Sequence, residues 1–161
     1  MIHVLIVDDE RIEREGLKYL LSMEEGEREI YEASNGKQAL QIIRTEDIQL
    51  LLTDIKMPHM DGLELARRAK EEKPGLQIVI FSGYNDFTFA QEAIRYGVTE
   101  YILKPVDPDS FHSVIEKVEK EISLRKQKET KEIKEKNFLH QYFLQNYLYS
   151  GSREILNRAA E

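Results

Sequence analysis

Residues 51–65, LLTDIKMPHMDGLEL, combine the patterns of a buried strand, a loop and the start of a helix. Three leucines at 50–52 predict a strand that is buried on both faces, as the strands of a parallel sheet are. The strand ends on a carboxylate, Asp54, although a carboxylate is costly to remove from water. A loop with a proline follows, and Asp61–Gly62 then predicts the start of a helix, because aspartate is a preferred N-cap. A buried strand, a loop and a helix in this order form the unit from which α/β proteins are built.

The same unit recurs along the first 122 residues. Nearly continuous runs of Val, Ile and Leu alternate with stretches in which apolar residues return at a spacing near the helical period. The apolar runs predict five parallel strands, at residues 2–7, 29–33, 49–54, 77–81 and 100–103. Four helices are predicted between them, and their inner faces are Ile12, Gly16, Tyr19 and Leu20; Ala39, Leu40 and Ile43; Leu63, Leu65, Ala66 and Ala69; and Phe89, Ala90, Ala93 and Ile94.

Capping residues mark the ends of these helices. Asn35, Asp61 and Asp86 are the predicted N-caps of the second, third and fourth helices, and Gly97 is the predicted end of the fourth. The strand at 29–33 alternates polar and apolar residues, which predicts an edge of the sheet. We therefore expect an α/β domain over residues 1–122.

Residues 107–161 predict helices with three different surfaces. A fifth helix begins near Asp107 and continues into residues 123–136, which contain no Gly or Pro and carry Glu and Lys or Arg four positions apart, as a charged helical linker does. Residues 137–161 begin with a wide apolar face, and SGS at 150–152 predicts the end of one helix and the start of another. We expect residues 137–161 to begin a further helical module that this chain does not complete. The inner face predicted for the fifth helix is Phe111, Val114, Ile115, Val118 and Ile122.

Charge is divided unevenly along the chain. Residues 1–124 carry 15 Lys and Arg against 25 Asp and Glu, a net charge of −10, whereas residues 125–136 carry 6 against 3, a net charge of +3. Nucleic acids are bound through phosphate neutralisation by Lys and Arg, so the acidic part is unsuited to them. The absence of cysteine excludes disulfides and thiolate zinc sites. Neither a signal peptide nor a run of about 20 apolar residues is present, so we expect a cytoplasmic protein without a membrane partner.

Ligand sites of parallel sheets lie at the carboxyl ends of the strands, and this chain places polar side chains at several of those ends. The first strand is followed by Asp8 and Asp9, the third ends on Asp54, and the fourth and fifth are followed by Ser82 and Lys104. Carboxylates gathered in this way repel each other, so the cluster predicts a bound cation, and oxygen ligands favour Mg²⁺. Since Mg²⁺ readily shares its shell with phosphate oxygens, the cluster predicts phosphoryl transfer. Asp54 would be the nucleophile, Asp8 or Asp9 would hold Mg²⁺, and Lys104 and Ser82 would bind phosphoryl oxygens.

Four motifs in this order resemble the receiver domain of bacterial two-component response regulators. They are VDDE at 7–10, TDIKMPHMDG at 53–62, FSG at 81–83 and YILKP at 101–105. The resemblance covers residues 1–122 and implies a flavodoxin-like, doubly wound (βα)5 fold. Its five parallel strands would follow the order 2-1-3-4-5, with an extended C-terminal helix.

The resemblance also implies site roles. Asp54 matches the phosphoacceptor, and Ser82 and Tyr101 match the hydroxyl and the aromatic residue of the family's switch. In that family the bond between the site lysine and the following proline is commonly cis. Asp8, Asp9, Asp54 and the backbone carbonyl of Lys56 match the family's Mg²⁺ ligands. Lys104 matches its phosphoryl-binding lysine.

The longer run FSGYNDFTFAQEAIRYGVTEYILKPVD, residues 81–107, is similar to one branch of that family, in which a helical linker joins the receiver to an AraC-type helix-turn-helix domain. The resemblance implies a histidine kinase as partner, a homodimer on phosphorylation, and transcription regulation through DNA binding by a C-terminal domain outside this chain. Phosphoryl acceptance at Asp54 would be self-catalysed, so a conventional turnover enzyme is not expected. In the family, two positions that correspond here to Lys56 and Tyr84 tune the lifetime of the phosphoryl group, and their bulk predicts slow autodephosphorylation.

Other classes of protein fit less well. A haloacid-dehalogenase-type phosphatase needs a second acid two residues after the nucleophile, where this chain has Lys56. A receiver that acts only as an adaptor has no need of the helices after residue 137, and a nucleotide-binding fold would need a glycine-rich phosphate loop that is missing. Glu10 is expected in the first helical turn rather than as a metal ligand. The four histidines lie in different elements without the spacing of metal ligands: His3, His59, His112 and His140.

Overall fold

The computed structural model describes the backbone of residues 1–83 and 87–158, and the side chains of these ranges except those of residue 87 and residues 149–158. The chain forms two compact units, Met1–Ile122 and Ser123–Glu161. Two residues singled out from the sequence, Asp86 and Tyr84, lie outside the described residues.

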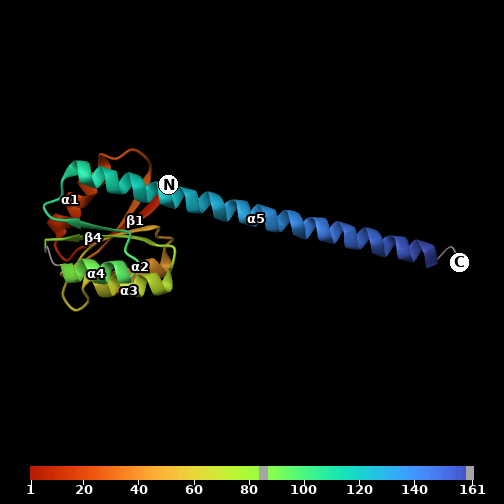
Figure 1. Cartoon of the computed structure of the whole chain (residues 1–161), viewed down its shortest axis with the longest axis horizontal. Helices are drawn as coiled ribbons and strands as arrows, with labels where there is room; N and C mark the ends of the chain where they lie inside the picture. The colour runs from red at the N-terminus through yellow and green to blue at the C-terminus, as the bar shows by residue number, and fades with distance from the viewer. Residues whose placement is uncertain (84–86, 159–161) are drawn as a thin grey trace. The chain divides into compact units, whose positions relative to one another are not determined.

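The first unit is built on a sheet of five parallel strands (Figure 1). The order β2-β1-β3-β4-β5 and the alternation of strands with helices confirm the predicted (βα)5 fold class. Each predicted strand agrees with the observed one to within one residue at either end. The strands are β1 (Ile2–Val7), β2 (Arg28–Ala33), β3 (Leu50–Asp54), β4 (Gln77–Ser82) and β5 (Glu100–Leu103).

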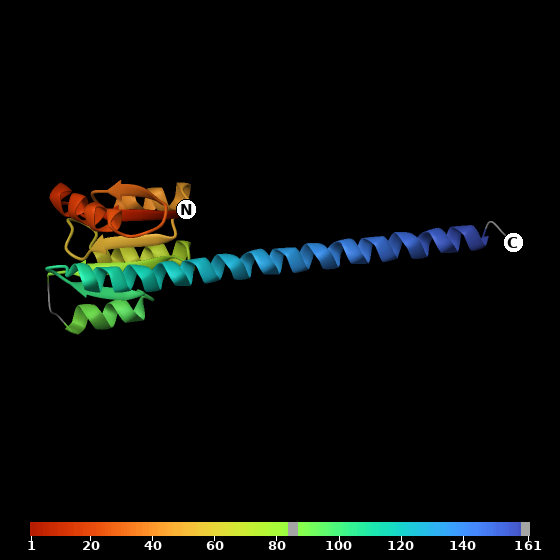
Figure 2. The same cartoon turned by 90° about the horizontal axis from the view of Figure 1, so that it is seen from above.

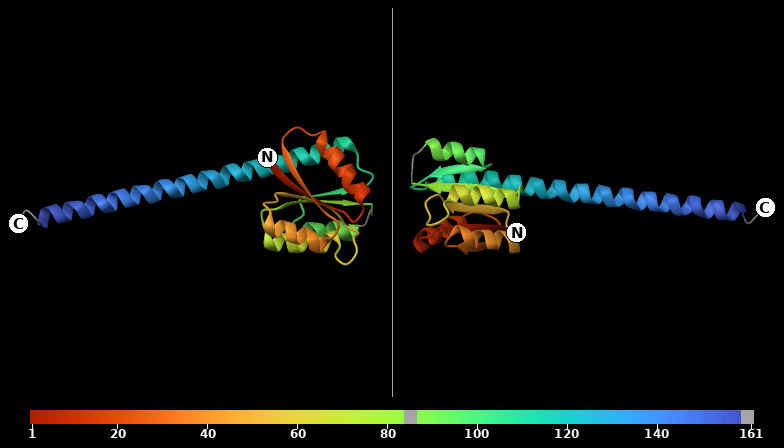
Figure 3. Two further views of the ribbon diagram at one scale, coloured as in Figure 1. Left: turned by 180° about the vertical axis from the view of Figure 1, so that it is seen from behind. Right: turned by 90° about the horizontal axis from the view of Figure 1, so that it is seen from below.

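Helices cover both faces of this sheet, as the views from above in Figure 2 and from behind and below in Figure 3 also show. One face carries α2 (Gly36–Thr45), α3 (Gly62–Glu72) and α4 (Phe87–Arg95). The opposite face carries α1 (Arg11–Ser22) and the first part of α5 (Pro108–Arg158).

Two hydrophobic clusters fill the space between the sheet and its helices. Alternate residues of a strand point to opposite faces, so β1 contributes Leu5 and Val7 to the cluster under α2 and α3, and Val4 and Ile6 to the cluster under α1 and α5. The central strands are therefore buried on both sides. The predicted inner faces of α2, α3 and α5 are confirmed, although Val114 in α5 is only partly buried.

The helix caps that the structure describes agree with the sequence. The side chain of Asn35 accepts a 2.8 Å hydrogen bond from the N–H of Gln38, and that of Asp61 accepts one of 2.8 Å from the N–H of Glu64. Gly97 follows α4 with a φ of 77°, the left-handed conformation that ends many helices.

The predicted inner face of α1 is confirmed only for Leu20, which packs against the core, and is wrong for the other predicted residues. Ile12 and Tyr19 are 78% and 66% exposed, and the residues buried against the sheet are Leu17 and Leu21. Apolar residues lie on several sides of this helix, so a spacing near 3.6 does not by itself select the buried side. Ile94 of α4, also predicted to face inward, is 77% exposed.

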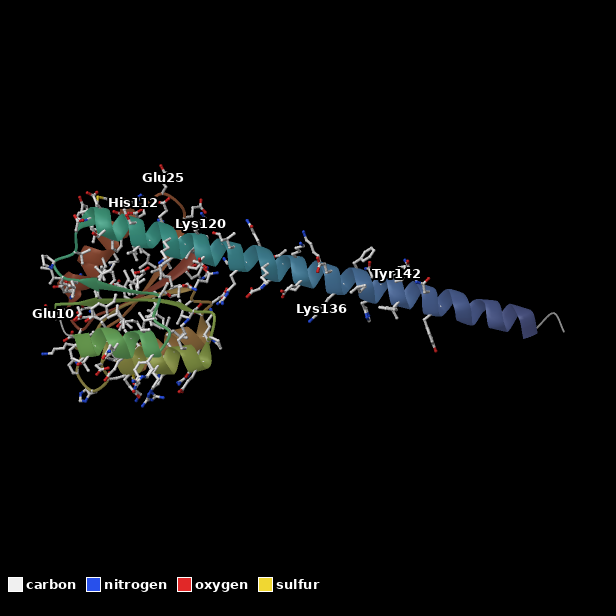
Figure 4. The ribbon with its side chains drawn as sticks, viewed as in Figure 1. Glu10, Glu25, His112, Lys120, Lys136 and Tyr142 are labelled. Atoms are coloured by element: carbon white, nitrogen blue, oxygen red, sulfur yellow. The ribbon has the colours of Figure 1, made fainter. Side chains whose placement is uncertain are left out.

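The second unit is helical over its described residues, 123–158, which belong to α5. The helix end predicted at residues 150–152 is absent, because a single glycine in a helix costs only about 1 kcal/mol. Figure 4 shows Lys136 and Tyr142 pointing away from the helix axis. No described helix is long and apolar enough to cross a membrane. Seven large side chains, called the apolar segment below, are 48–77% exposed: Phe138, Leu139, Tyr142, Phe143, Leu144, Tyr147 and Leu148.

Candidate functional site

Polar side chains meet at the carboxyl edge of the sheet. The register aligns Val7 of β1 with Thr53 of β3, and Ser82 of β4 with Leu103 of β5. The residues at and just after the ends of these strands therefore lie at the same edge of the sheet. They are Asp8, Asp9, Asp54 and Lys104. Glu10, labelled in Figure 4, marks this edge.

Local packing fixes the position of Asp54. On its N-terminal side, the buried Thr53 hydroxyl donates a 2.9 Å hydrogen bond to the Asp54 carbonyl oxygen. On its C-terminal side, the Gly62 N–H donates a 2.7 Å hydrogen bond to the carbonyl oxygen of Ile55. A Cβ atom on Gly62 would lie only 2.0 Å from the Asp54 carbonyl oxygen, so this approach of α3 requires glycine. The Ile55 N–H also donates a 2.9 Å hydrogen bond to Asp54 Oδ1, which orients the carboxylate.

Asp8 is the most buried of the three carboxylates. Only 2% of the residue is exposed, and its Oδ1 accepts a 2.9 Å hydrogen bond from the Glu10 N–H. Burial raises the pKa of Asp8 to about 6, even though the Glu10 N–H and the Lys104 ammonium act in the opposite direction. Burial also raises the pKa of Asp54, again against the effect of Lys104. The negative charges are thus only partly compensated by the protein, which favours a bound cation.

Lys104 is the ammonium group of this cluster. Its Nζ lies 3.6 Å from Asp8 Oδ2, 3.7 Å from Asp54 Oδ1 and 3.5 Å from Glu13 Oε2. Burial by itself lowers the pKa of Lys104, but the three carboxylates outweigh this effect and leave the pKa raised. The backbone N–H of Lys104 donates a 2.8 Å hydrogen bond to the Ser82 carbonyl, and the Lys104–Pro105 bond is cis.

The carboxylate cluster fits a divalent cation. Oxygen atoms of Asp8, Asp9 and Asp54 lie within 4.8 Å of one another, and the exposed Asp9 leaves the cluster open to solvent. Oxygen-only ligands with room for water are the environment that Mg²⁺ prefers. The donor set therefore agrees with the predicted Mg²⁺, with Asp8, Asp9 and Asp54 as the side chains in reach of it.

The remaining predicted site residues lie at or behind this edge. Ser82 is fully buried as the last residue of β4, one position past Phe81, which is paired with Asp54. Tyr101 is partly buried two positions before the end of β5 and packs against the core. Lys56 follows β3 in the loop, with an exposed side chain. Ser82 therefore ends its strand at the carboxyl edge, and Tyr101 lies further back along β5.

Glu13 also belongs to the site, although its position in the sequence was not predicted to do so. This residue lies in the first turn of α1, and its carboxylate is the nearest of the three to the Lys104 ammonium. The signal was present, because α1 begins two residues after Asp9 and Glu13 lies in its first turn, which places this carboxylate close to the carboxyl edge of the sheet.

Comparison with known proteins agrees with this geometry. The family model described as the response regulator receiver domain matches residues 4–116, and the chain belongs to this family. Its function is that of a receiver domain in two-component signalling, controlled by phosphorylation, rather than that of a conventional enzyme.

Among curated proteins, the chain is 37% identical over 119 residues to the uncharacterized transcriptional regulatory protein YesN of Bacillus subtilis, a match over 73% of this chain and 32% of that protein. It is 38% identical over 108 residues to the transcriptional regulatory protein HptR of Staphylococcus aureus, over 66% of this chain and 42% of that protein. The chain therefore spans less than half the length of these relatives.

Among solved structures, the REC domain of AraT, a response regulator from Geobacillus stearothermophilus, is 37% identical, with a TM-score of 0.67 over 78% of this chain and 98% of that chain. A two component transcriptional regulator AraC from Clostridium phytofermentans is 30% identical, with a TM-score of 0.70 over 78% of this chain and 98% of that chain.

Proposed function

We propose that Asp54 accepts a phosphoryl group from a partner histidine kinase in a Mg²⁺-dependent reaction. The position of its carboxylate carries this proposal, because it lies 3.7 Å from the Lys104 ammonium and within 4.8 Å of oxygen atoms of Asp8 and Asp9. Neither neighbour is as well placed. Asp8 is only 2% exposed, and Asp9 has no ammonium partner among the residues that the structure describes.

Asp54 acts as the nucleophile in this reaction. One of its carboxylate oxygens forms a bond to the phosphorus of a phosphohistidine while the P–N bond breaks, and the leaving imidazole takes up a proton. Asp8, Asp9, Asp54 and the backbone carbonyl of Lys56 would hold Mg²⁺, which would supply positive charge to offset that of the transferring group. Lys104 binds one of the phosphoryl oxygens. The chain is then a self-catalysed acceptor of the phosphoryl group.

Phosphorylation changes the charge at the carboxyl edge. The phosphoryl group brings about −1.5 to −2 charges near neutral pH, which Lys104 and the Ser82 hydroxyl would match. Movement of Ser82 toward the phosphoryl group would vacate space for Tyr101, which packs behind the edge. The surface of α4, β5 and α5 would be reshaped in turn. We also predict slow autodephosphorylation, because the bulk of Lys56 and Tyr84 would hinder a water molecule that attacks the acyl phosphate.

The second unit provides a route to an attached module. A helix that is apolar on most sides is normally buried, and the apolar segment defined above is exposed on this chain. The relatives named above are longer and are called transcriptional regulatory proteins. We therefore propose that residues 137–161 begin a further module, joined by a linker at 123–136 to the receiver at 1–122. In the whole protein this module would lead to an AraC-type DNA-binding domain, acting in the cytoplasm and as a homodimer on phosphorylation.

Mass spectrometry of the full chain tests the assignment of Asp54. After incubation with Mg²⁺ and a small donor such as phosphoramidate, the wild type is expected to gain one phosphoryl group, and removal of Mg²⁺ with EDTA is expected to prevent this. Asp54→Asn is expected to gain none. The matched control is Asp61→Asn, which makes the same substitution in the same loop and keeps a good N-cap. Labelling of Asp54→Asn at the wild-type level would overturn the proposal.

A further inference from the structure

The Lys104 ammonium is shared between three carboxylates rather than bound to one. Its distances to Asp8, Asp54 and Glu13 are 3.6, 3.7 and 3.5 Å. A charge-assisted hydrogen bond would be about 2.7–2.9 Å, so none of the three contacts is at full strength. The ammonium therefore lies between competing partners, and Glu13 is the nearest of them.

The three partners differ in how firmly they are held. The side chains of Asp8 and Asp54 are 3% and 16% exposed, and each has a backbone N–H on its carboxylate. The Glu13 side chain is 45% exposed and extends from α1 along a groove of about 470 Å³ that Lys104 also lines. Glu13 can thus follow or release the ammonium, whereas the two aspartates stay in place.

We propose that Glu13 is a positioning residue for Lys104, which holds the ammonium back from Asp54 before phosphorylation and competes with the phosphoryl group for it afterwards. This inference rests on the proposed function of Asp54. A phosphoryl group on Asp54 attracts the ammonium more strongly than the carboxylate does, because it carries more negative charge. Lys104 must then leave Glu13, and the loss of that contact weakens the phosphorylated state.

Removing the charge of Glu13 should affect a cation and a phosphoryl mimic in opposite directions. Without Glu13, Lys104 settles nearer to Asp8 and Asp54, where it competes with Mg²⁺, so Mg²⁺ should bind more weakly. The same ammonium is then available to a phosphoryl mimic, which should bind more tightly. Because a partly exposed ion pair contributes only a small free energy, we expect each affinity to change by about two- to fivefold. General damage to the site would weaken both ligands instead.

The test uses the full chain as wild type, Glu13→Gln and Glu15→Gln. Glu15 is a matched control, because it lies on the same helix, is 51% exposed, and pairs with Lys18 rather than with Lys104. NMR titrations measure the affinity for Mg²⁺ alone and for beryllofluoride at saturating Mg²⁺. The ¹⁵N resonance of the Lys104 ammonium, assigned with Lys104→Arg and followed at one fixed pH, reports on its contacts directly.

Glu13→Gln is expected to weaken Mg²⁺ binding, to tighten beryllofluoride binding, and to move the Lys104 resonance, while Glu15→Gln matches the wild type. Glu13→Ala is expected to give the same results, which would show that they do not depend on the amide group of the glutamine. An unmoved Lys104 resonance in the metal-free protein, or changes of both affinities in the same direction, would overturn the role of Glu13 while the wild type still binds beryllofluoride. A wild type that binds no beryllofluoride would overturn the proposed function, and this inference with it.

Discussion

Replacement of Gly62 by alanine should damage the fold and the site together. The new Cβ would lie 2.0 Å from the Asp54 carbonyl oxygen, 2.9 Å from its carbonyl carbon and 3.0 Å from Ile55 Cα. These are backbone atoms, so no side-chain rotation relieves the overlap. Since Cβ atoms essentially never approach another atom closer than 3.0 Å, the start of α3 and the end of β3 must separate by 1.0 Å or more.

This separation sets the size of the expected effect. Overpacking costs about 1–3 kcal/mol, and because only backbone can move here we expect about 3 kcal/mol. For a domain of this size that loss lowers Tm by roughly 10–15 °C. The shift also displaces Asp54 relative to Asp8 and Lys104, and a misplacement of 1 Å can reduce a reaction rate by about 100-fold. We therefore expect phosphorylation with a small donor and Mg²⁺ to slow by roughly 10- to 100-fold.

Thermal unfolding followed by circular dichroism and phosphorylation followed by mass spectrometry measure these two effects. Gly16→Ala is the matched control, since a Cβ on Gly16 meets nothing within 4 Å and the residue lies inside α1. Alanine is better than glycine in a helix by about 1 kcal/mol, so Gly16→Ala should keep or raise Tm and leave the phosphorylation rate unchanged. Wild-type stability and rate in Gly62→Ala would refute the argument that Gly62 sets the position of Asp54.

Three further predictions concern stability. Glu119→Ala should lower the free energy of unfolding by about 3 kcal/mol in urea, because the Arg28 side chain is only 7% exposed and would lose the carboxylate that pairs with its charge and accepts two of its hydrogen bonds. His112, at the outer side of α5 (Figure 4), has its pKa raised by a hydrogen bond with Glu24. Its stabilising effect should be complete below about pH 6.5 and lost as pH rises through the higher folded pKa, so His112→Gln should flatten the pH dependence of Tm. Mg²⁺ should raise Tm by mass action, with about 2.7 kcal/mol at 100 times its Kd, and Asp9→Asn should remove most of this shift.

Each of these predictions has a clear contrary result. Equal urea midpoints for Glu119→Ala and for Glu121→Ala, an exposed position on the same helix, would contradict the first. Parallel Tm profiles of wild type and His112→Gln across pH would contradict the second. A full Mg²⁺ shift in Asp9→Asn would contradict the third.

Much of the fold could be predicted because the residues of a single strand or helix are enough to identify that element. The leucines at 50–52 predicted a buried strand, which is observed, and Asn35 and Asp61 have the side chains that cap a helix. The carboxyl ends of parallel strands lie at the same edge of a sheet, and the register of the strands confirms this arrangement. The sequence could therefore place four residues at one edge: Asp8, Asp9, Asp54 and Lys104.

The predictions from sequence were wrong or incomplete where contacts between several helices and strands determine which residues are buried or paired. The apolar residues of α1 lie on several sides of the helix, and contact with β1 and α5 rather than periodicity selects Leu17 and Leu21 as the buried ones. Glycine at 151 predicted a helix end, but its cost is small inside a helix whose other residues favour that state. The contacts of Glu13 with Lys104, and of Arg28 with Glu119, join residues 91 positions apart in each pair, and local sequence carries no signal of such distances.

Borohydride trapping would show which aspartate carries the phosphoryl group. Borohydride reduces an aspartyl phosphate to homoserine, so the modified residue is identified by peptide sequencing in the mass spectrometer. After treatment of the full chain with Mg²⁺ and phosphoramidate, we predict homoserine at position 54 and at no other aspartate. Homoserine at position 8 or 9, or its absence from a protein that has gained a phosphoryl group, would contradict the assignment of Asp54 as the phosphoacceptor.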